Sequence, residues 1–280
     1  METKVSSREK EVIISDQRPT VLIGERINPT GKKRLADALR VGDLELVRAE
    51  AIAQVQAGAD ILDVNVGVAG LDEVSLLPEA VQAVSEVVDV PLCIDSGNSK
   101  ALEAALRVCG GKALVNSVSG EERSLAEVLP LIKEYGAAVI GLSMDEAGVS
   151  DNVERRVAIA HKIVERAVAL GIPAEDVVID CLVTAAGADS AAGLQTLETI
   201  RRIKNELGVN MTMGASNLSF GMPDRELLTG AFLAIAIAAG VNCPVVDVAK
   251  VRPVVLAADV VLNRDRYAMR YTQAYRQRRK

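Results

Sequence analysis

The stretch Gln56–Gly67, QAGADILDVNVG, contains one complete unit of a pattern that runs through most of the chain. Gly58 follows a helical stretch, and glycine just after the last helical turn is a common signal for a helix end. The apolar run that begins at Ile61 is short and bounded, as is typical of a buried strand. It ends with two polar side chains, Asp63 and Asn65. The stretch therefore predicts a helix, a tight turn and a buried strand whose last residues are polar.

The same unit recurs along the chain, with amphipathic stretches between the apolar runs. Apolar strands that each lead into a helix indicate a parallel sheet covered by helices. Eight such units in about 250 residues fit a closed (β/α)8 TIM barrel better than an open doubly wound sheet. The predicted strands are residues 21–28, 61–67, 91–96, 113–118, 138–144, 177–183, 211–217 and 243–249.

The rest of the chain adds little to this single predicted domain of residues 1–280. Residues 1–20 are expected to be an N-terminal extension, and residues 264–280 the basic end of a last helix. The insert at residues 29–43, PTGKKRLADALRVGD, predicts a short turn or helix beside the mouth of the barrel.

Composition excludes several classes of protein. The 280 residues carry a formal net charge of -6, and aromatic residues make up 2% with no Trp. Nucleic-acid binding needs a basic excess or stacking aromatics, so it is not expected. Residues 227–246 are uncharged and long enough to span a membrane, but Gly240, Asn242 and Pro244 break the stretch into a helix and a strand. No membrane association is expected.

Cysteine and histidine chemistry is also not expected. The four cysteines form no C-x-x-C pair, and the single histidine, His161, lies within a helical stretch. Structural zinc, a Ser-His-Asp triad and a Cys-His dyad therefore lack their residues, and no metal site is predicted. Scattered thiols behind a charged N-terminus indicate a reduced, cytoplasmic protein.

The ends of the predicted strands carry the residues from which a barrel builds its site. Short acids and amides dominate there, and they suit a neutral heterocycle with many hydrogen-bonding edges better than a phosphate. Glu25 and Arg26 are expected to form an internal ion pair at the rim. The polar strand-end residues are Glu25, Arg26, Asn28, Asp63, Asn65, Asp95, Ser96, Asn116, Ser117, Asp180, Ser216, Asn217, Asp247 and Lys250.

Seven motifs, in order and one per strand, carry a family resemblance. They are IGERIN (23–28), GADILDVNVG (58–67), LCIDS (92–96), LVNSVSGE (114–121), AAVIGLSM (137–144), VVIDCL (177–182) and GASNLSFG (214–221). Over residues 21–260 or so, the chain resembles the pterin-binding barrel superfamily. Within it, the chain looks most like the methyltetrahydrofolate:corrinoid methyltransferases, including the folate domain of cobalamin-dependent methionine synthase.

The resemblance implies an activity and a set of roles. Such enzymes move a methyl group between a ring nitrogen of tetrahydrofolate and the cobalt of a corrinoid carried on a separate corrinoid-binding protein, and they form homodimers. Methyltetrahydrofolate or tetrahydrofolate would be the folate substrate, and the direction of transfer stays open. By motif, the pterin would be held by Asp95, Asn116 and Asp180, the pocket shaped by Gly214 and Ser216, the folate tail met by Arg225, and further contacts made by Asn65 and Phe220.

Asn217 is the expected catalytic residue. A methylated tertiary amine is a poor methyl donor unless its nitrogen receives a proton or a strong hydrogen bond as the bond breaks. The Asn217 amide can donate such a bond to charge that develops in the transition state. The structural alternative is an Asx turn that caps the next helix.

Two other functions stay open. A dihydropteroate synthase-like enzyme would share the barrel but should carry a basic Ser-Arg-Lys type stretch at the seventh strand, where this chain reads Ser216-Asn217-Leu218-Ser219. A non-catalytic folate-binding subunit would bind folate without transferring its methyl group.

Overall fold

The computed structural model describes residues 1–278, and eight parallel strands form a barrel at its centre. They lie side by side in the order β10-β3-β4-β5-β6-β7-β8-β9. A parallel bridge between Gly214 and Val245, with a 3.0 Å bond from the Val245 N–H to the Met213 carbonyl, brings the two outer strands together. The strands are β3 (Ile23–Ile27), β4 (Ile61–Asn65), β5 (Leu92–Asp95), β6 (Leu114–Ser119), β7 (Ala138–Leu142), β8 (Val177–Asp180), β9 (Asn210–Thr212) and β10 (Val245–Val246).

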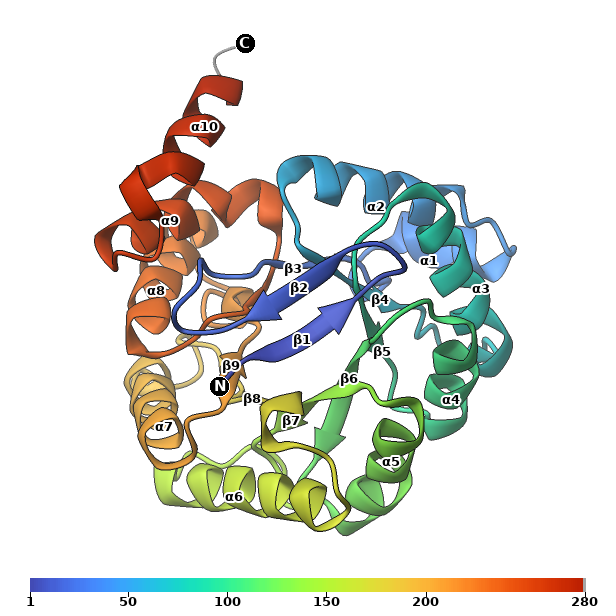
Figure 1. Ribbon diagram of the computed structural model, residues 1–280, viewed down its shortest axis with the longest axis horizontal. Coiled ribbons are helices and arrows are strands. Elements are labelled where there is room, and N and C mark those ends of the chain that lie inside the picture. The colour runs from blue at the N-terminus through green and yellow to red at the C-terminus, as the bar shows by residue number, and fades with distance from the viewer. Residues whose placement is uncertain (279–280) are drawn as a thin grey trace.

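Helices surround the barrel as an outer ring (Figure 1). The predicted TIM barrel is confirmed, including the short helix α1 (Lys33–Arg40) in the insert at residues 29–43. The other helices are α2 (Glu45–Ala57), α3 (Glu73–Val87), α4 (Ser99–Val108), α5 (Glu122–Tyr135), α6 (Val153–Ala169), α7 (Ala192–Leu207), α8 (Arg225–Ala239), α9 (Val248–Val261) and α10 (Met269–Arg278).

Local sequence signals explain where several helices begin and end. Gly58 and Gly136 follow α2 and α5 with φ values of 102° and 60°, a left-handed conformation that glycine adopts without steric cost. Asp72 and Asn98 cap the starts of α3 and α4 by accepting backbone N–H bonds.

The core has two parts, because successive strand residues point to opposite faces. Outward residues such as Leu62 and Val64 pack with the helices in the larger cluster. Inward residues such as Ile61, Cys93 and Leu114 form a second cluster inside the barrel. The inner cluster occupies the end of the barrel where the strands begin, which leaves the opposite end for polar side chains.

The N-terminal residues form an antiparallel hairpin that the sequence did not predict. Strands β1 (Thr3–Ser6) and β2 (Glu11–Ile14) cross the end of the barrel where the strands begin, facing the viewer in Figure 1. Val5, Val12 and Ile14 are buried in the inner cluster. The predicted extension is therefore a plug that closes one end of the barrel.

Buried amides hold this plug in place. Asn210 donates to the Thr3 hydroxyl at 2.8 Å and to the Ile14 carbonyl at 3.0 Å. Asn242 donates to Asp16 at 2.9 Å and to the Asn210 side-chain oxygen at 2.7 Å. These bonds satisfy polar groups that would be costly to bury alone.

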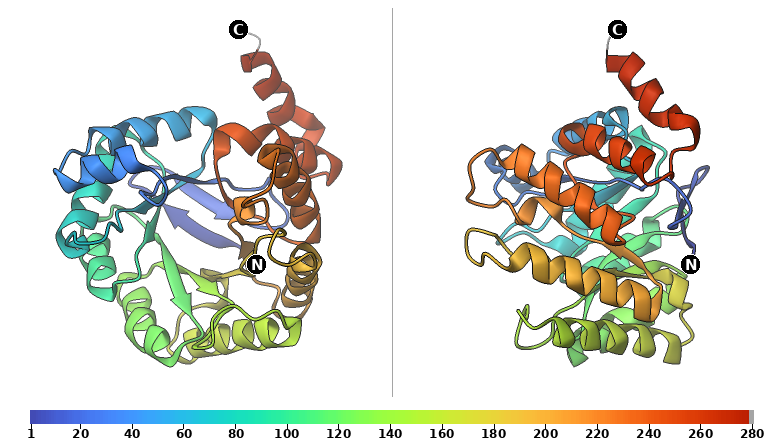
Figure 2. Two further views of the ribbon diagram at one scale, coloured as in Figure 1. Left: turned by 180° about the vertical axis from the view of Figure 1, so that it is seen from behind. Right: turned by 90° about the vertical axis from the view of Figure 1, so that its left-hand side faces the viewer.

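Most strands end earlier than the sequence predicted, and the difference is largest for β8, β9 and β10. Residues 181–183 leave β8 as a loop, residues 215–217 form a 3₁₀ turn, and Val248 already begins α9. At the C-terminus, α10 extends away from the barrel (Figure 2). Arg279 and Lys280, part of the predicted basic end, lie outside the described residues. No helix within residues 1–278 has both the length and the apolar character that a membrane span requires.

Candidate functional site

A layer of polar side chains lies directly above the apolar inner cluster. Its strand residues follow from the two-residue period of the strands, because each of them stands two positions after an inward apolar residue. Ile61 precedes Asp63, and Cys93 precedes Asp95. The layer borders a cavity of about 360 Å³, here called the mouth cavity. Its lining comprises Glu25, Asn28, Thr30, Lys32, Asp63, Asp95, Asn116, Asp180, Gly214, Ser216, Asn217 and Val245.

The structure brings most of the predicted site residues to this one cavity. Asp95 and Asp180 are the last residues of β5 and β8, Asn116 is the third of the six residues of β6, and Gly214, Ser216 and Asn217 come from the loop after β9. Asn65 and Phe220 are not among the lining residues. The Asn65 oxygen accepts the Gly67 N–H at 2.8 Å, and its side chain hydrogen-bonds to Asp95.

Asp63 orients the amide of Asn116. Asn116 donates its Nδ2 to an Asp63 carboxylate oxygen at 3.2 Å, which leaves the Asn116 oxygen as an acceptor for a ligand. Asp63 is only 2% exposed. Burial and then the neighbouring Asp95 raise the pKa of Asp63 well above its usual range, because both disfavour the charged form.

Burial also perturbs the other acids of the mouth cavity. It raises the pKa of Asp95 to about 6, against a lowering contribution from the Asn65 hydrogen bond. It raises the pKa of Asp180 to about 6 as well, although the Leu182 N–H donates to this carboxylate at 2.7 Å. Both acids would be mostly ionised at neutral pH and would accept hydrogen bonds from a donor-rich edge.

The loop after β9 presents the Asn217 amide without a hydrogen bond from its side chain to any described residue. Asn217 ends the 3₁₀ turn Ala215–Asn217, whereas the N-cap of α8 is Asp224. The capping alternative for Asn217 is therefore wrong. A Cβ on Gly214 would lie 2.9 Å from the Asn217 Nδ2, so the glycine makes room for this amide.

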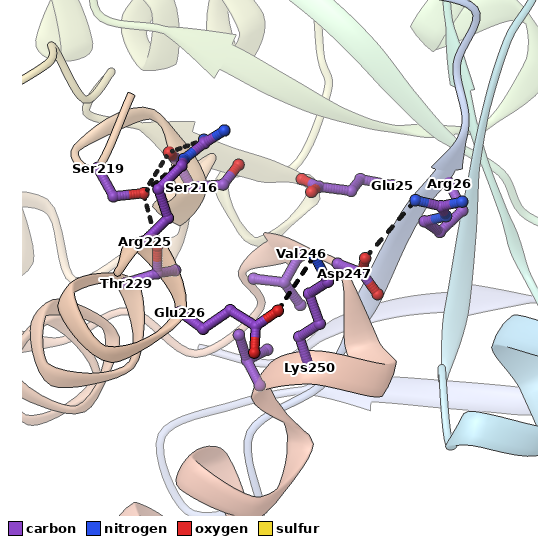
Figure 3. Close-up of a pocket in the computed structure, with 11 residues that line it drawn as sticks. Glu25, Arg26, Ser216, Ser219, Arg225, Glu226, Thr229, Val246, Asp247 and Lys250 are labelled. Carbon is purple, nitrogen blue, oxygen red and sulfur yellow. Dashed lines mark hydrogen bonds and ion pairs between the residues drawn. The ribbon is translucent and has the colours of Figure 1, made fainter. Parts of the chain in front are cut away.

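A second cavity of about 230 Å³, here called the side cavity, adjoins the mouth cavity. Glu25 and Ser216 line both, and the side cavity adds Arg225 and Lys250 (Figure 3). The Arg225 guanidinium donates to the Ser216 carbonyl at 3.0 Å and has no carboxylate partner within residues 1–278.

Phe220 lies beside this arginine and is largely exposed. The Arg225 guanidinium carbon is 5.7 Å from the centre of the Phe220 ring, within the range of a cation–π contact. Phe220 as a whole is 69% exposed. Its face toward solvent is therefore open to a ligand or partner at the mouth.

The expected ion pair between Glu25 and Arg26 is wrong. Arg26 instead pairs with Glu50 at 3.2 Å and with Asp247 at 3.7 Å. The two adjacent side chains reach different groups: Glu25 lines the mouth cavity, whereas the Arg26 guanidinium reaches Glu50 of α2 and Asp247 at the start of α9, and β3 is irregular between Gly24 and Ile27.

The sequence places Glu25 and Asp63 among the polar strand-end residues but gives neither a role in ligand binding, and it does not place Lys32 at the site. The two-residue spacing from Ile23 and Ile61 would have placed the first two inside the barrel. Lys32 follows no strand directly, and only the fold of the insert brings it to the mouth cavity. Among the described residues, no group of three or more His, Cys, Asp or Glu side chains is arranged to hold a metal ion.

The fold and cavity together define a class: a TIM barrel whose mouth is lined by acids and amides. The family described as pterin binding enzyme matches residues 24–247. The chain belongs to this pterin-binding family.

Two relatives of known name share moderate sequence identity with this chain. The chain is 33% identical over 267 residues to the methylcorrinoid:tetrahydrofolate methyltransferase of Eubacterium limosum, covering 92% of this chain and 96% of that protein. It is 31% identical over 252 residues to the methionine synthase of Mycobacterium leprae, covering 85% of this chain but 21% of that much longer protein.

Similar solved structures support the fold alone, since their identity to this chain is low. The dihydropteroate synthase of Xanthomonas albilineans superposes with a TM-score of 0.73 at 19% identity, covering 93% of this chain and 98% of that one. The dihydropteroate synthase of Thermus thermophilus gives a TM-score of 0.65 at 23% identity, covering 92% of this chain and 99% of that one.

Proposed function

We propose that the protein is a methyltransferase that moves a methyl group between methyltetrahydrofolate and the cobalt of a corrinoid carried on a separate protein. The main observation behind this proposal is the mouth cavity. It is lined by hydrogen-bond acceptors that suit the edge of a pterin and by the Asn217 side-chain amide, which no described residue hydrogen-bonds. The relative from Eubacterium limosum, matched over nearly its whole length, supports the same reaction by its name.

The acceptors suit the pterin ring. Asp95 and Asp180, when ionised, each accept hydrogen bonds from N–H groups, and Asp63 turns the Asn116 oxygen toward the same side. Three acceptors around one cavity match a ring whose amino and ring N–H groups are donors. Leaving one such buried group unpaired costs about 1 to 3 kcal/mol, so the arrangement would discriminate against other heterocycles.

The Asn217 amide would supply the hydrogen bond that the reacting nitrogen needs. As the bond between methyl and nitrogen breaks, the electron pair returns to the nitrogen, and the amide N–H stabilises it. An amide does not titrate in the working range, so this role is independent of pH. The proton that ends on the nitrogen must come from another group.

Further parts of the proposal concern the surroundings of the site. The Arg225 guanidinium would meet the carboxylate tail of the folate at the exit of the mouth cavity, and Phe220 would contact the benzoyl ring. The partner would be a corrinoid-binding protein, and the enzyme would act as a homodimer in the cytoplasm. A dihydropteroate synthase role is not proposed, because Ser216-Asn217-Leu218-Ser219 has no cation for a pyrophosphate.

The test combines binding and transfer. Isothermal titration with methyltetrahydrofolate is expected to show micromolar binding, and mixing the complex with cob(I)alamin should convert it to methylcobalamin. Asn217→Ala should slow transfer by about 10- to 1,000-fold, the usual effect of losing one such donor. Asn205→Ala, an exposed asparagine on α7, is the matched control.

Each other outcome has a clear meaning. Absence of binding would remove the pterin interpretation of the cavity. Binding without transfer to free cob(I)alamin or to a corrinoid protein would favour a non-catalytic folate-binding subunit. An Asn217→Ala variant with the wild-type rate would exclude the amide as the donor.

A further inference from the structure

Glu25 is an acid of the mouth cavity that the mechanism above does not use. Its carboxyl lies in a largely enclosed position, yet no described residue donates a hydrogen bond to it. The other acids of the cavity each have such a donor: Asn116 for Asp63, the Asn65 side chain for Asp95 and the Leu182 N–H for Asp180. A carboxyl without a protein partner is free to exchange a proton with a ligand.

The position of Glu25 gives it access to both ligand and solvent. It lines the mouth cavity and the side cavity, and its side chain extends toward Ser216 on the opposite wall (Figure 3). Ser216 adjoins Asn217, the residue proposed to contact the reacting nitrogen. A group here could act on a ligand in the mouth cavity and recover its proton through the side cavity.

The charges that face Glu25 are mixed. Burial is the largest cause that raises its pKa, and Asp247 raises it further, whereas Lys32, Arg26 and Arg225 lower it. Lys32 is itself held in place, because its ammonium donates to the Arg26 carbonyl at 2.8 Å and to the Glu25 carbonyl at 3.4 Å. The net result is a carboxyl that keeps its proton to a higher pH than an exposed glutamate does.

We propose that Glu25 is the general acid that protonates the methyl-bearing nitrogen of the folate. The proposal rests on the proposed function and supplies its missing proton donor. The Glu25 O–H bond breaks, and its proton forms a new bond to the nitrogen, which becomes cationic. The corrinoid cobalt then supplies the electron pair of the new cobalt–carbon bond, and the pair of the carbon–nitrogen bond stays on nitrogen.

The step balances without any further reagent. The products are methylated corrinoid, neutral tetrahydrofolate with N–H, and a Glu25 carboxylate that regains its proton from water. In the reverse direction, the same carboxylate takes the proton from the newly methylated, cationic nitrogen. One residue thus serves both directions, as microscopic reversibility requires of an acid–base group.

The alternatives in the cavity are less suitable as proton donors. Asp63 is 2% exposed and engaged with Asn116. Asp95 and Asp180 are needed as ionised acceptors for the ring. The Lys32 ammonium is committed to two main-chain carbonyls.

The test is the rate of methyl transfer from saturating methyltetrahydrofolate to cob(I)alamin, measured by stopped flow from pH 6 to 9, together with folate binding by titration. In Glu25→Gln, the neutral amide resembles the protonated acid, so the folate Kd should stay within about threefold while the rate falls by about 10²- to 10⁴-fold. The remaining rate should lose the decline with rising pH that Glu25 gives the wild type. Glu25→Asp should keep that decline at an intermediate rate.

Glu79→Gln is the matched control, because Glu79 is an exposed glutamate on α3 that lines neither the mouth cavity nor the side cavity. It should leave both the rate and its pH profile unchanged. If wild type transfers and Glu25→Gln keeps its rate and profile, the acid role is overturned while the methyltransferase stands. If Glu25→Gln loses folate binding instead, Glu25 is a binding residue and not the acid. If wild type neither binds nor transfers, the proposed function itself fails, and the acid role with it.

Discussion

Replacing Asp180 by asparagine should stabilise the protein while abolishing tight folate binding. Asp180 ends β8 inside the barrel, and burial raises its pKa from an ordinary 3.8 to about 6. Asparagine has nearly the same shape, and its oxygen can still accept the Leu182 N–H that now bonds the carboxylate at 2.7 Å. The substitution therefore removes a buried charge and little else.

The magnitude follows from the shift. One pKa unit corresponds to 1.36 kcal/mol, so a shift of about two units makes the ionised Asp180 cost about 3 kcal/mol of folding free energy. Because the folded-state pKa is the higher one, this cost is absent below about pH 4, grows as pH rises and is complete above about pH 6. Asp180→Asn should thus gain about 3 kcal/mol at pH 8 and almost nothing at pH 4.

Urea unfolding at the two pH values measures this difference directly. A domain of this size should also melt about 5 °C higher or more at pH 8. Asp89→Asn, at an exposed position between α3 and β5, is the control and should change neither value. Equal stability of Asp180→Asn and wild type at pH 8, or a loss, would refute the reasoning that burial penalises this carboxylate.

Three further changes test other parts of the site and fold. Gly214→Ala should push the Asn217 amide, which lies 2.9 Å from the new Cβ, back by about half an ångström and slow methyl transfer about tenfold. The control Gly97→Ala, whose new Cβ has nothing within 4 Å, should leave the rate unchanged. Equal rates in the two variants would contradict the packing argument. Folate affinity should fall below pH 6, by up to about tenfold per pH unit for each of Asp95 and Asp180, because these acceptors take up protons. A folate Kd that stays constant from pH 7 to 5 would show that neither acid must be ionised. Asn242→Ala should lower the free energy of unfolding by about 2 to 5 kcal/mol, because it leaves the partners of a fully buried amide unpaired. A loss of less than about 1 kcal/mol in urea unfolding would mean that water replaces the amide.

The sequence predicted the barrel because each strand repeats one signal. Apolar runs bounded by glycine or polar residues, such as that from Ile61, lie where buried strands were expected. The family motifs pointed to Asp95, Asn116 and Asp180, and these three side chains do line one cavity.

Other features depended on contacts that a linear pattern does not contain. Glu25 and Arg26 looked like a pair because they are adjacent and opposite in charge, but Arg26 binds Glu50 and Asp247, which lie far from it in the sequence. The hairpin was not predicted because β1 and β2 are four residues each and interrupted by charges such as Lys4 and Glu11. Their few apolar residues form strands only because the barrel gives them something to cover.

The apolar inner cluster and the hairpin that covers it close the barrel at the end where its strands begin, so a ligand can enter only at the mouth. Under the proposed function, the folate and the large corrinoid protein both approach through the mouth of the barrel. The folate must therefore bind first, and the folate product can dissociate only after the corrinoid protein has dissociated. The turnover rate would then depend on the order of binding and dissociation at the mouth as well as on the rate of methyl transfer. An excess of corrinoid protein should therefore hold the folate in the mouth cavity and slow the reaction.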